Sequence, residues 1–162
     1  MSTALQTLNL SLVALFMVTT LAHALEMPGK MRLSKDIYFA AQQIYYPGFT
    51  IAGIAEPVAM LTLLAQAYLL QETPVFWPSL AALFALIVAH AIYWLVTHPV
   101  NRFWLGEANL SRAGKTFFEA ASPATGNGID WRQMRSRWEY SHVARAVLTV
   151  FAFLILALAR VP

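Results

Sequence analysis

The sequence predicts an all-α fold: a four-transmembrane-helix bundle with both chain termini outside the cytoplasm. The 162-residue chain is 59% hydrophobic and only 12% charged, whereas soluble domains usually contain about 25% charged residues. Four apolar segments each have roughly the ~20 residues that cross a bilayer as a helix. Lys and Arg are concentrated in two of the connecting segments, which the positive-inside rule places in the cytoplasm. We therefore expect one membrane domain spanning residues 1–162.

The first apolar segment extends over about residues 5–25. Ala22-His23-Ala24 imitates the cleavage site of a secretory signal. However, no Lys or Arg precedes Leu5, and the apolar run is longer than the ~7–15 residues of a typical signal core. We therefore interpret this segment as a retained transmembrane helix.

The following loop, about residues 27–48, contains a second helical pattern. Its apolar residues recur at helical spacing: Ile37, Tyr38, Ala41, Ile44 and Tyr45. This pattern predicts a short helix at the membrane interface. Pro47-Gly48 is expected to end it. The second and third transmembrane helices then follow, over about residues 49–70 and 75–98.

The fourth helix is predicted over about residues 131–160, so its first turns would project into the cytoplasm. Asp130 is the expected N-cap, and Gln133 completes a capping-box pattern. The preceding loop, about residues 99–130, contains the turn-rich stretch 122–128, which is a candidate mobile lid. Trp131 and Trp138 have the character of interfacial anchors.

The positions of the cations orient the chain. The first loop contains three of them, and seven more lie between Arg102 and Arg145, whereas the N-terminus and the Gln71–Pro74 connection contain none. This places both loops in the cytoplasm and makes the chain a multi-pass protein of the inner cell membrane. The net charge of +3 follows from this asymmetry and gives no reason to expect a nucleic-acid partner. The chain has no cysteine, which excludes disulfides and thiolate chemistry.

Every predicted helix has polar residues near its cytoplasmic end. Three pairs are spaced so that both members share one helix face; they are His23 with Glu26, His98 with Asn101, and Glu139 with His142. Glu56 lies inside the second segment, where an unpaired carboxylate costs several kcal/mol. Pro57 follows it and is expected to kink that helix. The predicted topology places all these residues at one depth.

Lone Glu ligands and Glu/His pairs from several helices are the ligand set of carboxylate-bridged dimetal bundles. We therefore predict a site for two transition-metal ions. Iron is the preferred metal, and zinc and manganese are the alternatives. The six predicted ligands are His23, Glu26, Glu56, His98, Glu139 and His142. No catalytic residue distinct from these ligands is predicted.

A second set of residues is expected beside the metal ions or the substrate: Asn101, Arg145, His90, Trp94, Trp104 and Trp138. Asn101 would hydrogen-bond a ligand or a substrate oxygen. Arg145 would balance the anionic charge or bind an anionic substrate. The three tryptophans would form the wall of an aromatic pocket that opens to the cytoplasmic leaflet.

Each of these residues also has a purely structural explanation. A Glu or His at a helix end can be an interfacial residue that reaches toward water. Glu139 can pair with Arg135 or Arg145, and His90 can be a hydrogen-bonded core histidine. The metal site is favoured because the four helices supply such groups at the same depth.

Two motifs resemble the anthrone-oxygenase-like family of small four-helix membrane proteins. They are His98-Pro99-Val100-Asn101 and Trp138-Glu139-x-x-His142-x-x-Arg145. Segments 23–34 and 42–49 also look like bacterial members, so the resemblance extends over most of the chain. It implies oxygenation of an activated aromatic C–H to a quinone carbonyl.

The leading hypothesis is a membrane oxidoreductase or oxygenase that acts on a lipophilic or aromatic small molecule at the dimetal site. The metal would activate O₂ or a peroxide. One alternative is a cytochrome-like protein with haem held between two of His23, His98 and His142. Another is a non-enzymatic transporter or proton relay. The expected partners are the lipid bilayer and the small molecule, and a homo-oligomer is left open.

Overall fold

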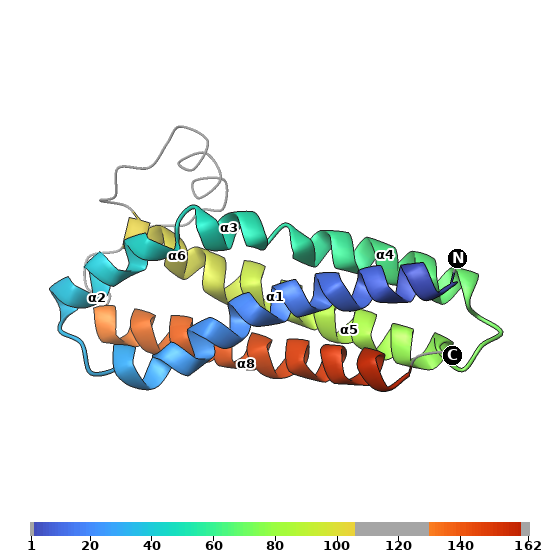
Figure 1. Cartoon of the computed structure of the whole chain (residues 1–162). Helices are drawn as coiled ribbons and strands as arrows, with labels where there is room; N and C mark the ends of the chain where they lie inside the picture. The colour runs from blue at the N-terminus through green and yellow to red at the C-terminus, as the bar shows by residue number, and fades with distance from the viewer. Residues whose placement is uncertain (1, 106–129, 160–162) are drawn as a thin grey trace.

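The structure, a computed structural model, describes residues 2–105 and 130–159, with side chains described over 3–101 and 130–159. Its long helices lie side by side in a bundle (Figure 1). Four spans are long and apolar enough to cross a membrane, namely Thr3–Lys30, Gly48–Leu69, Phe76–Asn101 and Trp131–Leu158. The predicted all-α bundle of four such helices is confirmed.

The bundle core is built from α1 (Ser2–Lys30), α4 (Ala55–Leu69), α5 (Phe76–Ile92) and α8 (Trp131–Leu158). Helix α8 packs along both α1 and α5, and α4 packs along α1 and α5. Small residues are fully buried where these helices meet, and they allow the close backbone approach typical of membrane bundles. They include Ala59, Ala82, Ala89 and Ala152. Helix α1 extends one turn beyond its predicted end and includes Pro28 in its last turn.

The second span is interrupted, as Pro57 predicted. A short helix, α3 (Gly48–Ala52), precedes α4. Pro57 has no amide hydrogen to donate to the carbonyl of Gly53, one turn earlier. That carbonyl instead accepts from the amide of Glu56 at 3.1 Å. The next bond, from the amide of Val58 to the carbonyl of Ile54, is long at 3.5 Å. The chain is therefore not α-helical at residues 53–54.

The third span contains a wide turn that the sequence did not predict. Helix α5 continues into a π-helical turn, η2 (Tyr93–Thr97), and then into α6 (His98–Leu105). Such turns insert one residue into a helix and occur frequently at functional sites. The hydroxyls of Thr97 and Ser141 lie 2.8 Å apart, which joins this turn to α8.

The short helix predicted after the first span is present as α2 (Lys35–Gln42), followed by the 3₁₀ turn η1 (Gln43–Tyr45). Its face differs in part from the predicted one, because Tyr38 is fully buried whereas Ile37 and Ile44 are exposed. The N-cap of α8 is confirmed, since the carboxylate of Asp130 accepts from the amide of Arg132 at 3.0 Å.

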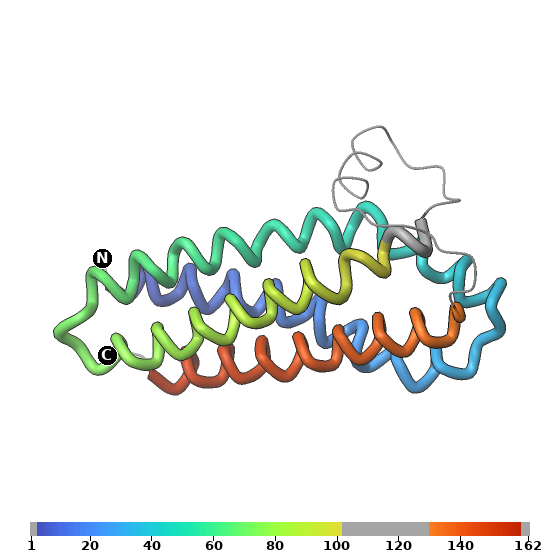
Figure 2. Tube along the Cα trace, turned by 180° about the vertical axis from the view of Figure 1, so that it is seen from behind, coloured from blue at the N-terminus to red at the C-terminus, as the bar shows by residue number. Residues whose placement is uncertain are grey.

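A polar network joins three helices at the end of the bundle opposite α2. The Asn9 amide donates to the Gln66 side-chain oxygen at 2.9 Å, and the Gln66 amide donates to the Ser79 hydroxyl at 2.9 Å. The Thr62 hydroxyl donates to Asn9. The start of α1 and the end of α8 lie at this same end, away from α2 (Figure 2). We call these four residues the polar clamp.

Candidate functional site

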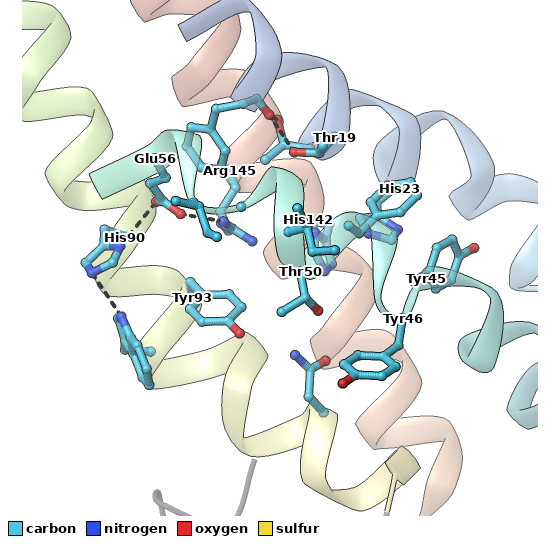
Figure 3. A pocket seen from close by; sticks show the side chains of 18 of the residues that line it. Thr19, His23, Tyr45, Tyr46, Thr50, Glu56, His90, Tyr93, His142 and Arg145 are labelled. Atoms are coloured by element: carbon cyan, nitrogen blue, oxygen red, sulfur yellow. Dashed lines mark hydrogen bonds and ion pairs between the residues drawn. The ribbon is translucent and has the colours of Figure 1, made fainter. Parts of the chain in front are cut away.

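A cavity of about 450 Å³ lies in the half of the bundle toward α2. This volume lies within the range of about 300–1,000 Å³ found for small-molecule sites. Its walls come from all four spans and from η1, and Figure 3 shows the side chains that converge there. One third of the lining residues are aromatic, namely Phe16, Tyr45, Tyr46, Phe49, Tyr93, Trp94 and Trp138.

Two histidines face each other on the cavity wall. The ring centroids of His23 and His142 are 4.2 Å apart. Trp138 packs against both rings, at 4.9 Å from His23 and 4.2 Å from His142. Both histidines are only 5% exposed. Neither ring nitrogen of His142 has a hydrogen-bond partner among the described residues. Since a buried polar atom without a partner costs about 1–3 kcal/mol, these nitrogens are available for hydrogen bonds to a bound molecule.

A buried ion pair occupies another part of the wall. The Arg145 guanidinium donates to the Glu56 carboxylate at 3.1 Å. The other Glu56 oxygen lies 3.4 Å from Nδ1 of His90, whose Nε2 accepts from the Trp94 indole at 2.9 Å. The guanidinium also lies 4.9 Å from the Tyr93 ring centroid. These contacts, visible in Figure 3, hold Arg145 in a fixed position at the cavity.

A second charged cluster lies behind Trp138, at the junction with α2. Glu139 is completely buried, and its carboxylate accepts from the Tyr38 hydroxyl at 2.8 Å and lies 3.2 Å from Nζ of Lys30. Lys30 is itself 5% exposed, with its ammonium 4.6 Å from the Trp138 ring centroid. Burial and the Glu139 carboxylate raise the pKa of Tyr38, so its phenol remains a donor. Burial also raises the pKa of Tyr45, which donates to the more exposed Glu26.

Replacing Lys30 by methionine should destabilise the protein by about 3–5 kcal/mol, because the completely buried Glu139 carboxylate would lose its cation. The double variant Lys30→Met/Glu139→Gln should regain most of that loss. Chemical denaturation in detergent, followed by tryptophan fluorescence, measures both. Equal stability of the Lys30→Met variant and the wild type would contradict the pairing.

The six predicted metal ligands fall into separate groups. His23, Glu56 and His142 line the cavity. Glu26 and Glu139 instead contact Lys30. His98 is fully buried on α6, with its ring 4.8 Å from that of Trp94. In residues 2–105 and 130–159, no three His, Asp or Glu side chains are grouped so as to hold a metal ion.

The carboxylates explain why the predicted dimetal arrangement does not fit this geometry. A carboxylate-bridged site needs Glu oxygens that are free to bind metal. Here Glu56 contacts Arg145 and His90, and Glu139 contacts Tyr38 and Lys30. The structural alternative considered for Glu139, a pair with Arg135 or Arg145, is replaced by a pair with Lys30 at the end of α1. Arg135 instead donates to the Leu33 carbonyl at 3.3 Å.

Most residues predicted beside the site do line the cavity. They are Asn101, Arg145, His90, Trp94 and Trp138. Asn101 accepts from the Trp138 indole at 2.6 Å. The side chain of Trp104 and the candidate lid at 122–128 lie outside the part of the chain that the structure describes.

Three residues that contribute to the cavity or to its neighbouring charged cluster were not predicted from the sequence. Lys30 is four residues after Glu26 and seven after His23, so helical spacing already places all three on one face. Tyr93 is three residues after His90. Tyr45 was considered only as part of an interfacial helix, yet its ring centroid lies 4.4 Å from that of His23. Helical spacing identifies the first two, whereas a tertiary contact made by η1 places the third.

A scan against protein-family models, and searches of curated proteins and of solved structures, find no match to this chain. The resemblance to the anthrone-oxygenase-like family therefore depends on the motifs quoted above. Four residues of these motifs line the cavity, namely Asn101, Trp138, His142 and Arg145. Glu139 does not line it and instead contacts Lys30.

Proposed function

We propose that the protein is a membrane-embedded enzyme that binds a flat, lipophilic, hydroxyl-bearing ring in the cavity and oxygenates it. One observation carries the proposal: His142 is buried in an aromatic wall, and both its ring nitrogens lack partners among the described residues. Aromatic walls with a few converging polar groups are typical of sites for small ring compounds. The reaction class comes from the resemblance to the anthrone-oxygenase-like family.

His142 is the candidate base of the site. Its imidazole would accept the hydrogen bond of a ring hydroxyl and then remove a proton from the substrate. Arg145, three residues later on α8, would stabilise the resulting oxyanion, because Glu56 and the Tyr93 ring already hold its guanidinium in place. The ring of His23, 4.2 Å from that of His142, would help to fix the orientation of the His142 imidazole.

An electron-rich ring anion of this kind reacts with O₂. The overall change replaces a ring CH₂ by C=O: one O₂ is consumed, one oxygen atom enters the product, and the other leaves as water with the two hydrogens. The protein would orient the ring, take up the proton and keep bulk water out of the cavity.

The location of the site follows from the distribution of Lys and Arg. The α2 end of the bundle contains Lys30, Lys35 and Arg135, and the positive-inside rule places that end at the cytoplasmic face of the inner membrane. Both termini would then lie outside the cytoplasm. The cavity would be at the depth of the cytoplasmic leaflet.

Turnover of a hydroxyanthrone tests the proposal. Protein reconstituted in nanodiscs should convert dithranol to the corresponding anthraquinone with consumption of one O₂ per product. Absorbance of the quinone and an oxygen electrode measure the two quantities. Empty nanodiscs give the rate of autoxidation. A rate equal to that background would refute the proposed function.

The dimetal oxygenase predicted from the sequence is the second candidate, because three of its six predicted ligands line this cavity. It requires Glu56 to exchange Arg145 for metal. Because Glu56 and Glu139 are already paired with cations, we expect turnover to persist after chelation of metal ions. We also expect metal analysis to find less than one iron, manganese or zinc ion per chain. Two ions per chain, lost on Glu56→Gln substitution, would establish the dimetal alternative instead.

The haem and transporter alternatives have simpler tests. The rings of His23 and His142, 4.2 Å apart, are too close for a porphyrin to lie between them, which leaves the two pairs that include His98 for the haem alternative. A Soret band in purified protein would support haem held by one of those pairs. Transport in proteoliposomes that persists after chelation would favour the transporter or proton relay, for which the buried Glu and His residues are the expected groups.

A further inference from the structure

Part of the cavity wall is also part of the protein surface. Ile51 and Ile54 line the cavity and are 62% and 61% exposed, and Trp94 lines it and is 41% exposed. Pro57 lines it and is exposed as well. The cavity therefore has a mouth, bordered on one side by α3 and the start of α4 and on the other by η2.

The mouth lies within the apolar length of the helices. Ile51, Ile54 and Pro57 belong to the span Gly48–Leu69, and Trp94 belongs to the span Phe76–Asn101. In a membrane, these exposed side chains contact acyl chains, because water does not reach the apolar length of a spanning helix. The molecules that meet this mouth are therefore those dissolved in the bilayer.

The two sides of the mouth belong to different packing units. Helix α3 packs against α1 and η1, whereas η2 packs against α5, α6 and α8. Helix α3 is only five residues long and is bounded by Pro47 before it and by residues 53–54, which are not α-helical, after it. Breaks of this kind are where backbone rotation is concentrated when a segment moves.

We infer that the mouth between α3 and η2 is the substrate entrance, and that it admits uncharged lipophilic ring molecules sideways from the bilayer. The inference rests on the proposed function for the identity of the substrate. It adds the route by which the substrate reaches the cavity and the charge that the substrate has on entry. The mouth's border of two isoleucines, a proline and a tryptophan is apolar, and the exposed Thr50 beside them carries no charge. The partly exposed His90 already contacts Glu56 and Trp94, so among the described residues no ionic group at the mouth is free to pair with a charged molecule. The hydroxyl therefore enters protonated and meets its hydrogen-bonding partners, His142 and Arg145, only inside.

The absence of cysteine from the chain allows a direct test. Thr20 lines the cavity and is 2% exposed, so a cysteine at this position is reached through the cavity. Thr20→Cys protein in nanodiscs is treated with pyrene maleimide, which partitions into the bilayer, or with a charged, water-borne thiosulfonate. We expect the bilayer reagent to react and the charged reagent to react at least about tenfold more slowly, which corresponds to about 1.4 kcal/mol.

A larger side chain at the mouth should slow the reaction of the bilayer reagent with the introduced cysteine. Adding Ile54→Trp to Thr20→Cys should lower its rate about tenfold, whereas Leu61→Trp, on the lipid-exposed face of α4 and away from the cavity, should leave it unchanged. Ile54→Ala should raise the rate of the bilayer reagent and leave that of the charged reagent unchanged, whereas misfolding would expose the buried position and raise both rates.

Three outcomes would overturn the entrance. They are an unchanged rate with Ile54→Trp, a charged reagent as fast as the bilayer reagent, and no reaction even with Ile54→Ala. Because these measurements use no dithranol, they separate the two proposals. If dithranol is not turned over but the Ile54 variants change the labelling rate, the proposed oxygenase is refuted and the entrance is supported. If dithranol is turned over but the Ile54 variants do not change the labelling rate, only the entrance is refuted.

Discussion

Replacing His142 by glutamine should reduce dithranol oxygenation by about a hundredfold to ten-thousandfold, the usual contribution of a positioned base. Glutamine retains a hydrogen-bonding side chain of similar volume but does not accept a proton. The loss should therefore appear in kcat, with a much smaller change in the affinity for dithranol. Quinone formation over a range of dithranol concentrations separates the two quantities.

Ser141→Ala is the matched control for this experiment. Ser141 precedes His142 on α8 but contacts Thr97 and does not line the cavity. We expect its turnover to remain within about twofold of wild type, because the side chain of Ser141 does not line the cavity. Wild-type kcat in the His142→Gln variant would show that His142 is not the base.

Replacing Arg145 by methionine should destabilise the protein by about 3–5 kcal/mol, because the buried carboxylate of Glu56 would lose its partner. Glu56→Gln should cost less, and the double variant should be more stable than Arg145→Met alone. Unfolding in mixed detergent, followed by circular dichroism, measures the whole cycle. This non-additivity is the signature of a direct pair.

The same cycle distinguishes the ion pair from a metal site. If Glu56 were a metal ligand, Glu56→Gln would lower the metal content, whereas Arg145→Met, which removes the competing cation, would maintain or raise it. If the two residues are ion-paired, both single variants should leave the metal content unchanged. Additive stability effects for Glu56 and Arg145 would contradict the ion pair itself.

The spans and their caps were predictable because local chemistry determines them. A run of about 20 apolar residues has no alternative to a helix in lipid. Pro57 removes a backbone donor, which fixed the position of the break before α4. Asp130 supplies a carboxylate just before a helical segment, and it caps α8 as expected.

The partners of the buried charges were not predictable by the same means. Depth along the bundle follows from helix direction, which is why His23, Glu56 and His142 do reach one cavity. The rotation of each helix about its own axis could not be predicted. Successive residues are about 100° apart around the axis, and a helix that is apolar on all sides has no polar face that indicates which side faces its neighbours. The π-turn at residues 93–97 changes that rotation further. Hence Glu139 faces Lys30 and Tyr38, although sequence spacing suggested an arginine on its own helix.

The polar clamp gives the two ends of the bundle different mechanical roles. Asn9, Gln66 and Ser79 join α1, α4 and α5 through side-chain hydrogen bonds in an apolar surrounding, where such bonds hold helices in register. Helix sliding or rotation is thereby resisted at the end where α1 begins and α8 ends (Figure 2). The proposed entrance lies in the opposite half, where α3 is short and separated from α4. A fluorescent protein or affinity tag fused at either end of this chain would thus be attached at the end of the bundle that is remote from the proposed entrance (Figure 2).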